Sequence, residues 1–181
     1  MHDKATADFT ITCNGKNFPV HRAIISARSR VLRAMFQSDM EEAKTGVHKI
    51  DHPPIDDKCL EEMIHFIYTG RLTGNYVDIQ ALCFAADKYD IKGLVRAICT
   101  KLEVGEAREG RVWYGRPDQV ADMLIAGDLH NIEQLKKMAI QRIKINKEIL
   151  ADREFKAKIM HYPRVLFELL QGSINNVELF H

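Results

Sequence analysis

The chain has 181 residues, enough for one domain with an extension or for two small domains. Its 46% hydrophobic and 28% charged residues are typical of globular proteins, and its net charge of +1 does not favour nucleic-acid binding. The sequence has no apolar run near the ~20 residues of a membrane helix, and its N-terminus lacks a signal-peptide core. We expect an intracellular protein, nuclear or cytoplasmic, that binds neither nucleic acid nor membrane.

The first elements are predicted to be β-strands. Apolar residues alternate with threonines over residues 9–13, the period of a half-buried strand. Asn14–Gly15 predicts a tight hairpin turn, and a second strand follows over residues 17–21. Pro19 cannot donate to a ladder, so this strand should have an open edge there. A third, short strand is predicted at residues 48–51.

Helices are predicted to dominate the rest of the first half. Helical spacing and boundary residues indicate the following helices: 21–28, 29–37, Asp56 or Asp57 to Gly70, 78–89 and 91–102. Ser29 is expected to be the N-cap of the second of them. A few strands followed by clustered helices predict an α+β domain over residues 7–102.

The remainder is predicted to be a loop and then more helices. Residues 103–117 contain three glycines and a proline and are expected to form a linker. A helix should run from Asp118 to near Gly127. Asn131 and Gln134 resemble a capping box for the next helix, and a last helix should follow Pro163 and end at Gly172.

The cysteines and histidines do not form the pattern of a metal site. The four cysteines are widely spaced and contain no CxxC pair, which argues against zinc and against a disulfide framework. His48 and His52 lie four residues apart, but no third ligand is near them in the sequence. We interpret both histidines as solvated turn residues and expect no metal ion and no cofactor.

Catalytic signatures are also missing from the sequence. It contains no GxSxG, GxGxxG or HExxH motif and no phosphate-binding GxxxxGK followed by Ser or Thr. Acidic pairs such as Glu41–Glu42 and Glu61–Glu62 are adjacent in sequence, so on a helix they point apart and do not share a proton. We therefore do not expect an enzyme.

Several sequence strings, in their order and spacing, resemble the BTB/POZ family: ADFTITCNGKNFPVHRAIISARS, MFQSDMEEAKTG, FIYTGRL and AADKYDIKGL. A later string, MLIAGDLHNIEQLKKMAI, is similar to the region after the BTB domain in the speckle-type POZ proteins, substrate adaptors of cullin-3 ubiquitin ligases. The resemblance covers residues 7–171.

The resemblance implies a BTB/POZ fold, a small β-sheet flanked by helical hairpins, over residues 7–102. After the 103–117 linker, residues 118–181 would form an all-helical 3-box and partial BACK extension. The implied function is that of a non-catalytic substrate adaptor that docks a cullin-3-type scaffold through the BTB and 3-box helices. The residues that match the family's cullin-binding surface are Phe36, Met40, Glu42, Tyr89 and Asp90, and those that match its dimer interface are Asp8, Arg22 and Ile24.

Residue chemistry alone gives simpler interpretations of some of these positions. Phe36 stands at the end of an amphipathic helix, where a phenylalanine more often belongs to the core than to an interface. Tyr89 can be interpreted simply as the cap of the helical stripe. Glu42 alone would belong to a solvated face. Met40, by contrast, stands in a polar stretch and has no obvious role in a core.

The start of the chain bears on self-association. Seven residues precede Asp8, which leaves no sequence for the swapped N-terminal helix of dimeric BTB domains, so we expect a monomer or a weak dimer. The MATH domain of the speckle-type proteins has no counterpart, and the substrate is not indicated. Three alternatives to the adaptor stay open: a self-association scaffold or transcriptional corepressor module without cullin binding, a channel-type tetramerisation domain and, last, an enzyme.

Overall fold

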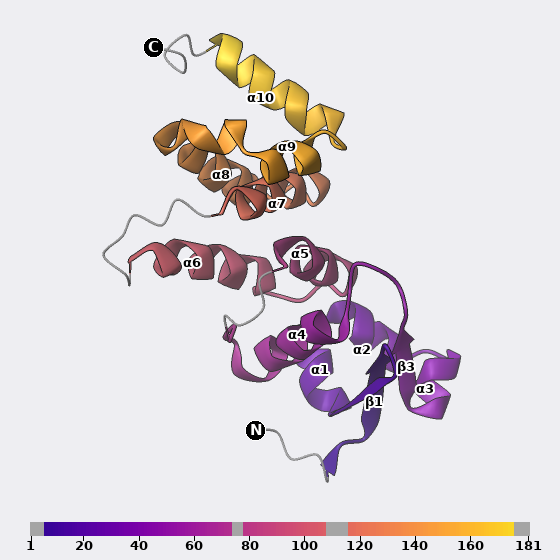
Figure 1. Ribbon diagram of the computed structural model, residues 1–181. Coiled ribbons are helices and arrows are strands. Elements are labelled where there is room, and N and C mark those ends of the chain that lie inside the picture. Colours follow the sequence, from indigo (N-terminus) through magenta and orange to yellow (C-terminus); the bar gives the residue numbers. More distant parts are fainter. Residues whose placement is uncertain (1–5, 74–77, 108–115, 176–181) are drawn as a thin grey trace. The chain divides into compact units, whose positions relative to one another are not determined.

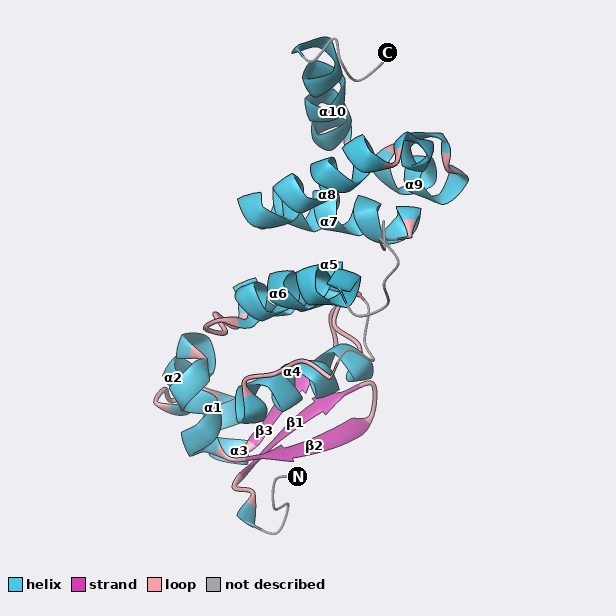
Figure 2. Ribbon diagram, turned by 90° about the vertical axis from the view of Figure 1, so that its left-hand side faces the viewer, coloured by secondary structure: helices cyan, strands magenta, loops and turns pink. Residues whose placement is uncertain are grey.

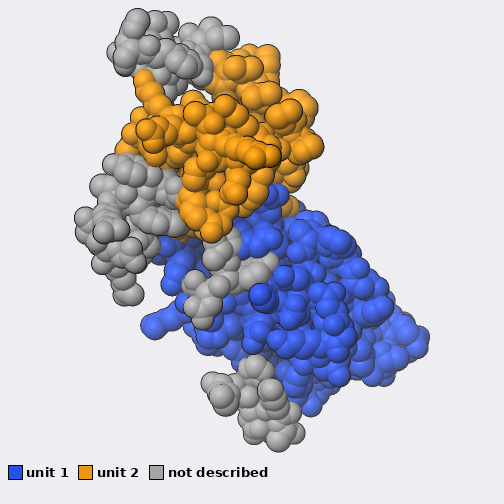
Figure 3. All heavy atoms as spheres, in the orientation of Figure 1, with its two compact units in different colours: residues 1–101 blue, residues 102–181 orange. Residues whose placement is uncertain are grey.

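The computed structural model describes residues 6–73, 78–107 and 116–175. The chain divides into two compact units, Met1–Lys101 and Leu102–His181, shown in different colours in Figure 3. Within the described residues, no helix is both long enough and apolar enough to cross a membrane.

The first unit contains a small mixed sheet. Strands β1 (Phe9–Cys13), β2 (Lys16–Val20) and β3 (Val47–Ile50) are arranged in the order β2-β1-β3. β1 pairs antiparallel with β2 and parallel with β3. The hairpin turn at Asn14–Gly15 has positive φ at both residues, 49° and 77°, as its sequence predicted.

One face of the sheet forms part of the core. Phe9, Ile11 and Cys13 are buried while the intervening threonines are half-buried, so the predicted alternation along β1 is confirmed. Figure 2 shows helix α4 (Asp57–Thr69) lying over the sheet. Ile11 pairs with His48 of β3, which places the histidine on the same face of the sheet.

The other helices of this unit follow in chain order: α1 (Arg22–Arg28), α2 (Arg30–Phe36), α3 (Glu41–Thr45), α5 (Ile79–Lys88) and α6 (Leu94–Ala107), which runs past the unit boundary. Predicted boundary residues are confirmed. The Ser29 hydroxyl accepts from Leu32 N at 3.0 Å, the Asp56 carboxylate accepts from Cys59 N at 2.7 Å, and Gly70 ends α4 with φ 70°.

Two segments of the first unit differ from prediction. α3 was missed because its residues, EEAKT, show no apolar periodicity. The expected linker begins later than residue 103, because α6 continues to Ala107. The single glycine in that stretch costs a helix only about 1 kcal/mol, which does not end it. The rest of the expected linker, including Trp113–Tyr114, lies largely outside the described residues.

The second unit is helical. Its elements are α7 (Pro117–Leu129), α8 (Glu133–Ile145), the 3-10 helix η2 (Lys147–Ala151), α9 (Arg153–Ile159) and α10 (Pro163–Asn175). α7 packs against α8 and α9, as Figure 1 shows. Ion pairs join the helices: Lys136 Nζ lies 3.2 Å from Asp128 and 3.3 Å from Glu168, and Lys158 lies 2.7 Å from Asp122.

Three predicted helix boundaries in this unit are wrong. Gly127 lies inside α7, where a Cβ would come within 3.1 Å of Lys136 N and 3.2 Å of Ile132 O. The residue is needed for close packing rather than for a helix end. Asn131 is not an N-cap but a left-handed turn residue with φ 53°, and Gln134 therefore has no capping box to complete. Gly172 is helical, and α10 continues to Asn175.

Candidate functional site

The candidate site is built around helix α3, which lies beside strand β3 (Figure 1). Met40 is the N-cap of α3 in extended conformation, φ −64° and ψ 153°, and its side chain is 50% exposed. Its neighbours Asp39 and Glu41 are exposed as well. The prediction that Met40 has no core role is therefore confirmed.

The acidic residues beside Met40 suit the start of a helix. Glu41 and Glu42 occupy the first turn of α3, where negative charge interacts favourably with the helix dipole, and Lys44 is in the last turn. Gly46 ends the helix with φ 74°, and its N–H donates to Glu42 O at 3.1 Å. Glu42 is half-buried, whereas Glu41 is exposed.

Phe36 belongs to a cluster with Phe9 and Arg22. The two rings meet edge to face with centroids 4.7 Å apart. The guanidinium of Arg22 lies over both rings, 4.9 Å from the centroid of Phe9 and 5.5 Å from that of Phe36. Phe36 is half-buried, so part of this residue stays accessible near Met40 and Glu42.

Tyr89 is part of the core rather than of the surface. The residue is only 2% exposed, and burial raises the pKa of its phenol. Its carbonyl accepts from the Ser29 hydroxyl at 2.5 Å, and its Oη lies 3.3 Å from His48 Nε2. The Tyr89 side chain is thus not available to a partner without rearrangement.

Asp90 follows Tyr89 in a left-handed turn with φ 45° and is half-buried. Its carboxylate pairs with Arg30 Nε, and this hydrogen bond lowers the pKa of Asp90 below its usual value. Asp90 is therefore a charged residue at the surface, but its charge is already paired within the chain.

The interpretation of His48 and His52 as solvated turn residues is wrong. Both are half-buried, and Nδ1 of each ring is buried without a hydrogen-bond partner. His52 contacts Lys88 through Nε2 and meets the Phe84 ring edge to face. Burial lowers the pKa of His48, while the nearby carboxylate of Glu42 opposes this shift. His48 thus lies between α3 and the end of α5.

The predicted dimer residues lie at the start of the first unit. Ile24 is 37% exposed on α1. Asp8 and Arg22 are brought together, but through the backbone: Asp8 Oδ1 accepts from Arg22 N at 2.8 Å. The Arg22 guanidinium instead donates to Ala43 O at 3.0 Å. Sequence reasoning missed this contact, because no local pattern links a residue on α1 to a carbonyl of α3.

The described residues contain no group of three or more His, Cys, Asp or Glu side chains that could hold a metal ion. The cysteines are all buried and unpaired with one another. Burial raises the pKa of Cys83 to about 12, so its thiolate, the nucleophilic form, is scarce near neutral pH.

Two solved BTB domains are similar to part of this chain. A solved structure of the BTB domain of zebrafish PATZ1 is 18% identical, with a TM-score of 0.43 over 56% of this chain and 76% of that one. The BTB domain of human Gigaxonin is 23% identical, with a TM-score of 0.42 over 53% and 77% of the two chains. The model of the BTB/POZ domain family matches residues 1–105, more than half of the sequence. The chain belongs to the BTB/POZ family, whose domain is a protein-interaction module.

Proposed function

We propose that this chain is a non-catalytic adaptor module that binds a cullin-3-type scaffold through the docking segment, Met40–Glu42, and the surface beside it. The observation that carries the proposal is the position of Met40. Its apolar side chain is half exposed between acidic residues at the start of α3. A flexible, polarisable methionine suits an apolar pocket on a partner.

Met40 and the residues around it would each contribute to binding in a different way. Burying the methionine could contribute about 1.5–3 kcal/mol. Glu42, at the rim, would contribute orientation and association rate more than affinity. Phe36 would contact the partner through the exposed part of its side chain, and Asp90 would contact it through the carboxylate beside the buried Tyr89.

The second unit would extend the contact. Its first two helices, α7 and α8, form a hairpin at the position that resembles the 3-box of the speckle-type POZ proteins. We assign to this hairpin a supporting contact with the scaffold and to α9 and α10 the start of a BACK-like domain. The protein that such an adaptor would present for ubiquitination is not identified by these residues.

The test is calorimetric titration of the full chain with the N-terminal domain of a cullin-3. Met40→Asp should weaken binding at least tenfold, since about 1.4 kcal/mol corresponds to a factor of ten. Met160→Asp is the matched control, because Met160 is 72% exposed on the second unit and lies away from the docking segment in sequence. Both variants should keep the thermal midpoint of the wild type, because exposed substitutions usually change stability by less than about 0.5 kcal/mol.

The charge of Glu42 gives an independent check. Glu42→Lys should weaken scaffold binding more at low salt than at high salt, since dissolved ions screen exposed charges. Equal loss at both salt concentrations would mean that Glu42 acts through the fold of α3. If Met40→Asp binds the scaffold like the wild type, the proposed function fails.

Self-association is the second candidate function. It is favoured by Ile24, 37% exposed on α1, and Val31, 43% exposed on α2, because apolar side chains left at a surface can pair with a second copy. Analytical ultracentrifugation tests it. Ile24→Asp should raise the dissociation constant of any dimer, and a chain that stays monomeric at millimolar concentration would rule the candidate out.

A further inference from the structure

Helix α3 is not held in place by its own side chains. It spans five residues, none of them buried, and its N-cap makes no side-chain hydrogen bond. An isolated helix shorter than about 12–15 residues is marginal in water. The position of α3, and with it that of Met40 and Glu42, must come from contacts with other parts of the first unit.

Hydrogen bonds that involve the backbone or the Ser38 hydroxyl fix the two ends of the segment. At the C-terminal end, Thr10 N donates to Gly46 O at 2.9 Å and so joins the segment to β1. At the N-terminal end, Met40 N donates to Ser38 Oγ at 3.3 Å, and the Ser38 hydroxyl donates to Met35 O at 2.7 Å. These contacts leave the middle of α3 to be held by something else.

That contact is supplied by Arg22. Its Nη2 donates to Ala43 O at 3.0 Å, in the middle of α3. Among the described residues, Arg22 is the only helix or strand residue outside α3 whose side chain hydrogen-bonds to α3. Hydrogen bonds from a charged donor are stronger than those between neutral groups, and the half-buried site limits competition from water.

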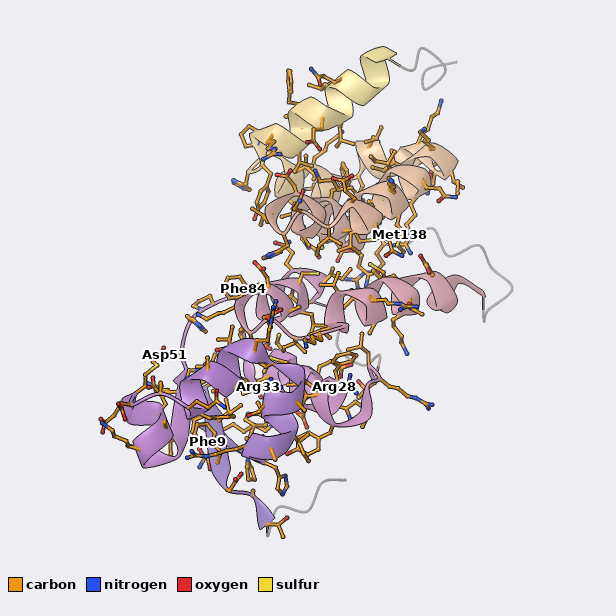
Figure 4. All side chains as sticks on the ribbon, turned by 180° about the vertical axis from the view of Figure 1, so that it is seen from behind. Phe9, Arg28, Arg33, Asp51, Phe84 and Met138 are labelled. Atoms are coloured by element: carbon orange, nitrogen blue, oxygen red, sulfur yellow. The ribbon has the colours of Figure 1, made fainter. Side chains whose placement is uncertain are left out.

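Arg22 is itself oriented before it reaches α3. Its guanidinium lies over the rings of Phe9 on β1 and Phe36 on α2, and its backbone N–H is held by Asp8. Figure 4 marks Phe9 at this end of the unit. One planar cation therefore connects α1, β1, α2 and α3. A lysine could supply the charge but not the stacked, forked geometry.

We infer that Arg22 is the positioning residue of the docking segment: its guanidinium, stacked on Phe9 and Phe36, holds Ala43 O and thereby fixes where Met40 and Glu42 are presented. This role rests on the proposed function, but the hold on α3 is a property of the free protein. It replaces the expected side-chain pairing of Arg22 with Asp8 at a dimer interface.

Hydrogen exchange of the free full chain, followed by NMR, tests the hold on α3. Arg22→Met keeps an apolar stem but removes the guanidinium. It should speed exchange at Ala43 N and Gly46 N, which donate to Met40 O and Glu42 O, both at 3.1 Å, and leave Leu60 N in α4 protected. Arg33→Met is the matched control, because Arg33 Nε donates to Ser26 O at 2.8 Å away from α3 (Figure 4 labels Arg33).

A double-mutant cycle on cullin-3 binding then tests the link to Met40. Arg22→Met should lower affinity about threefold to tenfold, roughly 0.7–1.4 kcal/mol, and Arg22→Lys should recover part of that loss. In a Met40→Asp background, Arg22→Met should have a clearly smaller effect, because of the two side chains that Arg22 positions only Glu42 remains. A purely structural role would instead give additive losses.

The outcomes separate the two proposals. Unchanged exchange at Ala43 and Gly46 in Arg22→Met, or additive losses in the cycle, would overturn the role of Arg22. If Met40→Asp binds the scaffold normally, the proposed function fails, and the exchange data alone decide whether Arg22 holds α3. If Arg22→Met does not fold, Arg22→Gln, which lacks the charge and the stacked guanidinium, is measured in the same way, and amides in α3 as protected as in the wild type would again refute the inference.

Discussion

Helices α3 and α7 are held in place in opposite ways. Every residue of α7 from Gln119 to Gly127 is buried, and the helix packs against α8 and α9. α3 has no buried residue and depends on an arginine from α1 and on hydrogen bonds at its ends. The contrast shows how one chain can combine a tightly packed helix, α7, with a short helix, α3, whose side chains stay available to a partner.

The largest expected effect comes from removing part of the α7 core. Ile125 is fully buried, so Ile125→Ala removes apolar contacts and leaves a cavity. We expect the free energy of unfolding of the full chain to fall by about 2–5 kcal/mol in a denaturant titration. Ala43→Gly in α3 should cost no more than about 1 kcal/mol. Equal losses at the two sites would remove the contrast.

A smaller loss is expected from adding one methyl group to α7. Helix propensity alone predicts that Gly127→Ala stabilises a helix by about 1 kcal/mol. The new Cβ, however, would lie 3.1 Å from Lys136 N and 3.2 Å from Ile132 O, backbone atoms that cannot easily move. Overpacking of this kind costs about 1–3 kcal/mol, so the thermal midpoint should fall. A raised midpoint would show that α7 and α8 pack less tightly than described.

The pH dependence of stability tests whether His48 of β3 is buried near Glu42 of α3. Burial holds the pKa of His48 below its ordinary value of 6.5, with His52 and Lys88 acting in the same direction and Glu42 against them. Below pH 6.5 the unfolded chain takes up a proton that the folded chain does not, so stability falls until the lowered pKa is reached. Above pH 6.5 this contribution is fully present.

The matching variant is His48→Gln, which keeps a polar side chain but does not titrate. Its free energy of unfolding, measured between pH 5.5 and 7.5, should depend less steeply on pH than that of the wild type. Tyr89, whose Oη lies 3.3 Å from His48 Nε2, stays uncharged over this range, since the ordinary pKa of a tyrosine is about 10 and burial raises it further. Parallel pH profiles for the two proteins would mean that His48 is solvated after all.

The same contrast explains what could be predicted from the sequence. Apolar periodicity along β1 and α4, and caps such as Ser29 and Asp56, are local signals, and the elements formed where they were expected. α3 carries no apolar periodicity, because neighbouring elements rather than its own side chains place it. Gly127 was predicted to end its helix, because a local sequence pattern does not show that the start of α8, at Ile132 and Lys136, packs against this glycine.

The candidate site, too, could be predicted from the sequence only in part. Met40 stood out because an apolar residue in a polar stretch has no use in a core, and the structure leaves it half exposed. Tyr89 did not differ, in sequence, from a surface tyrosine; only the folded contacts with Ser29 and His48 show that it is buried. The stacking of Arg22 on Phe9 and Phe36 joins α1, β1 and α2. No sequence pattern within any one of these elements indicates it.

Hydrogen exchange of the full chain, followed by mass spectrometry, with and without the N-terminal domain of a cullin-3, tests directly whether a cullin binds at Met40 and α3. We expect complex formation to slow exchange in the peptides that cover residues 36–46, where Met40 and α3 lie, while exchange in the buried core of α4 stays the same. A complex that leaves residues 36–46 unprotected, or the lack of any complex at concentrations well above micromolar, would contradict this expectation.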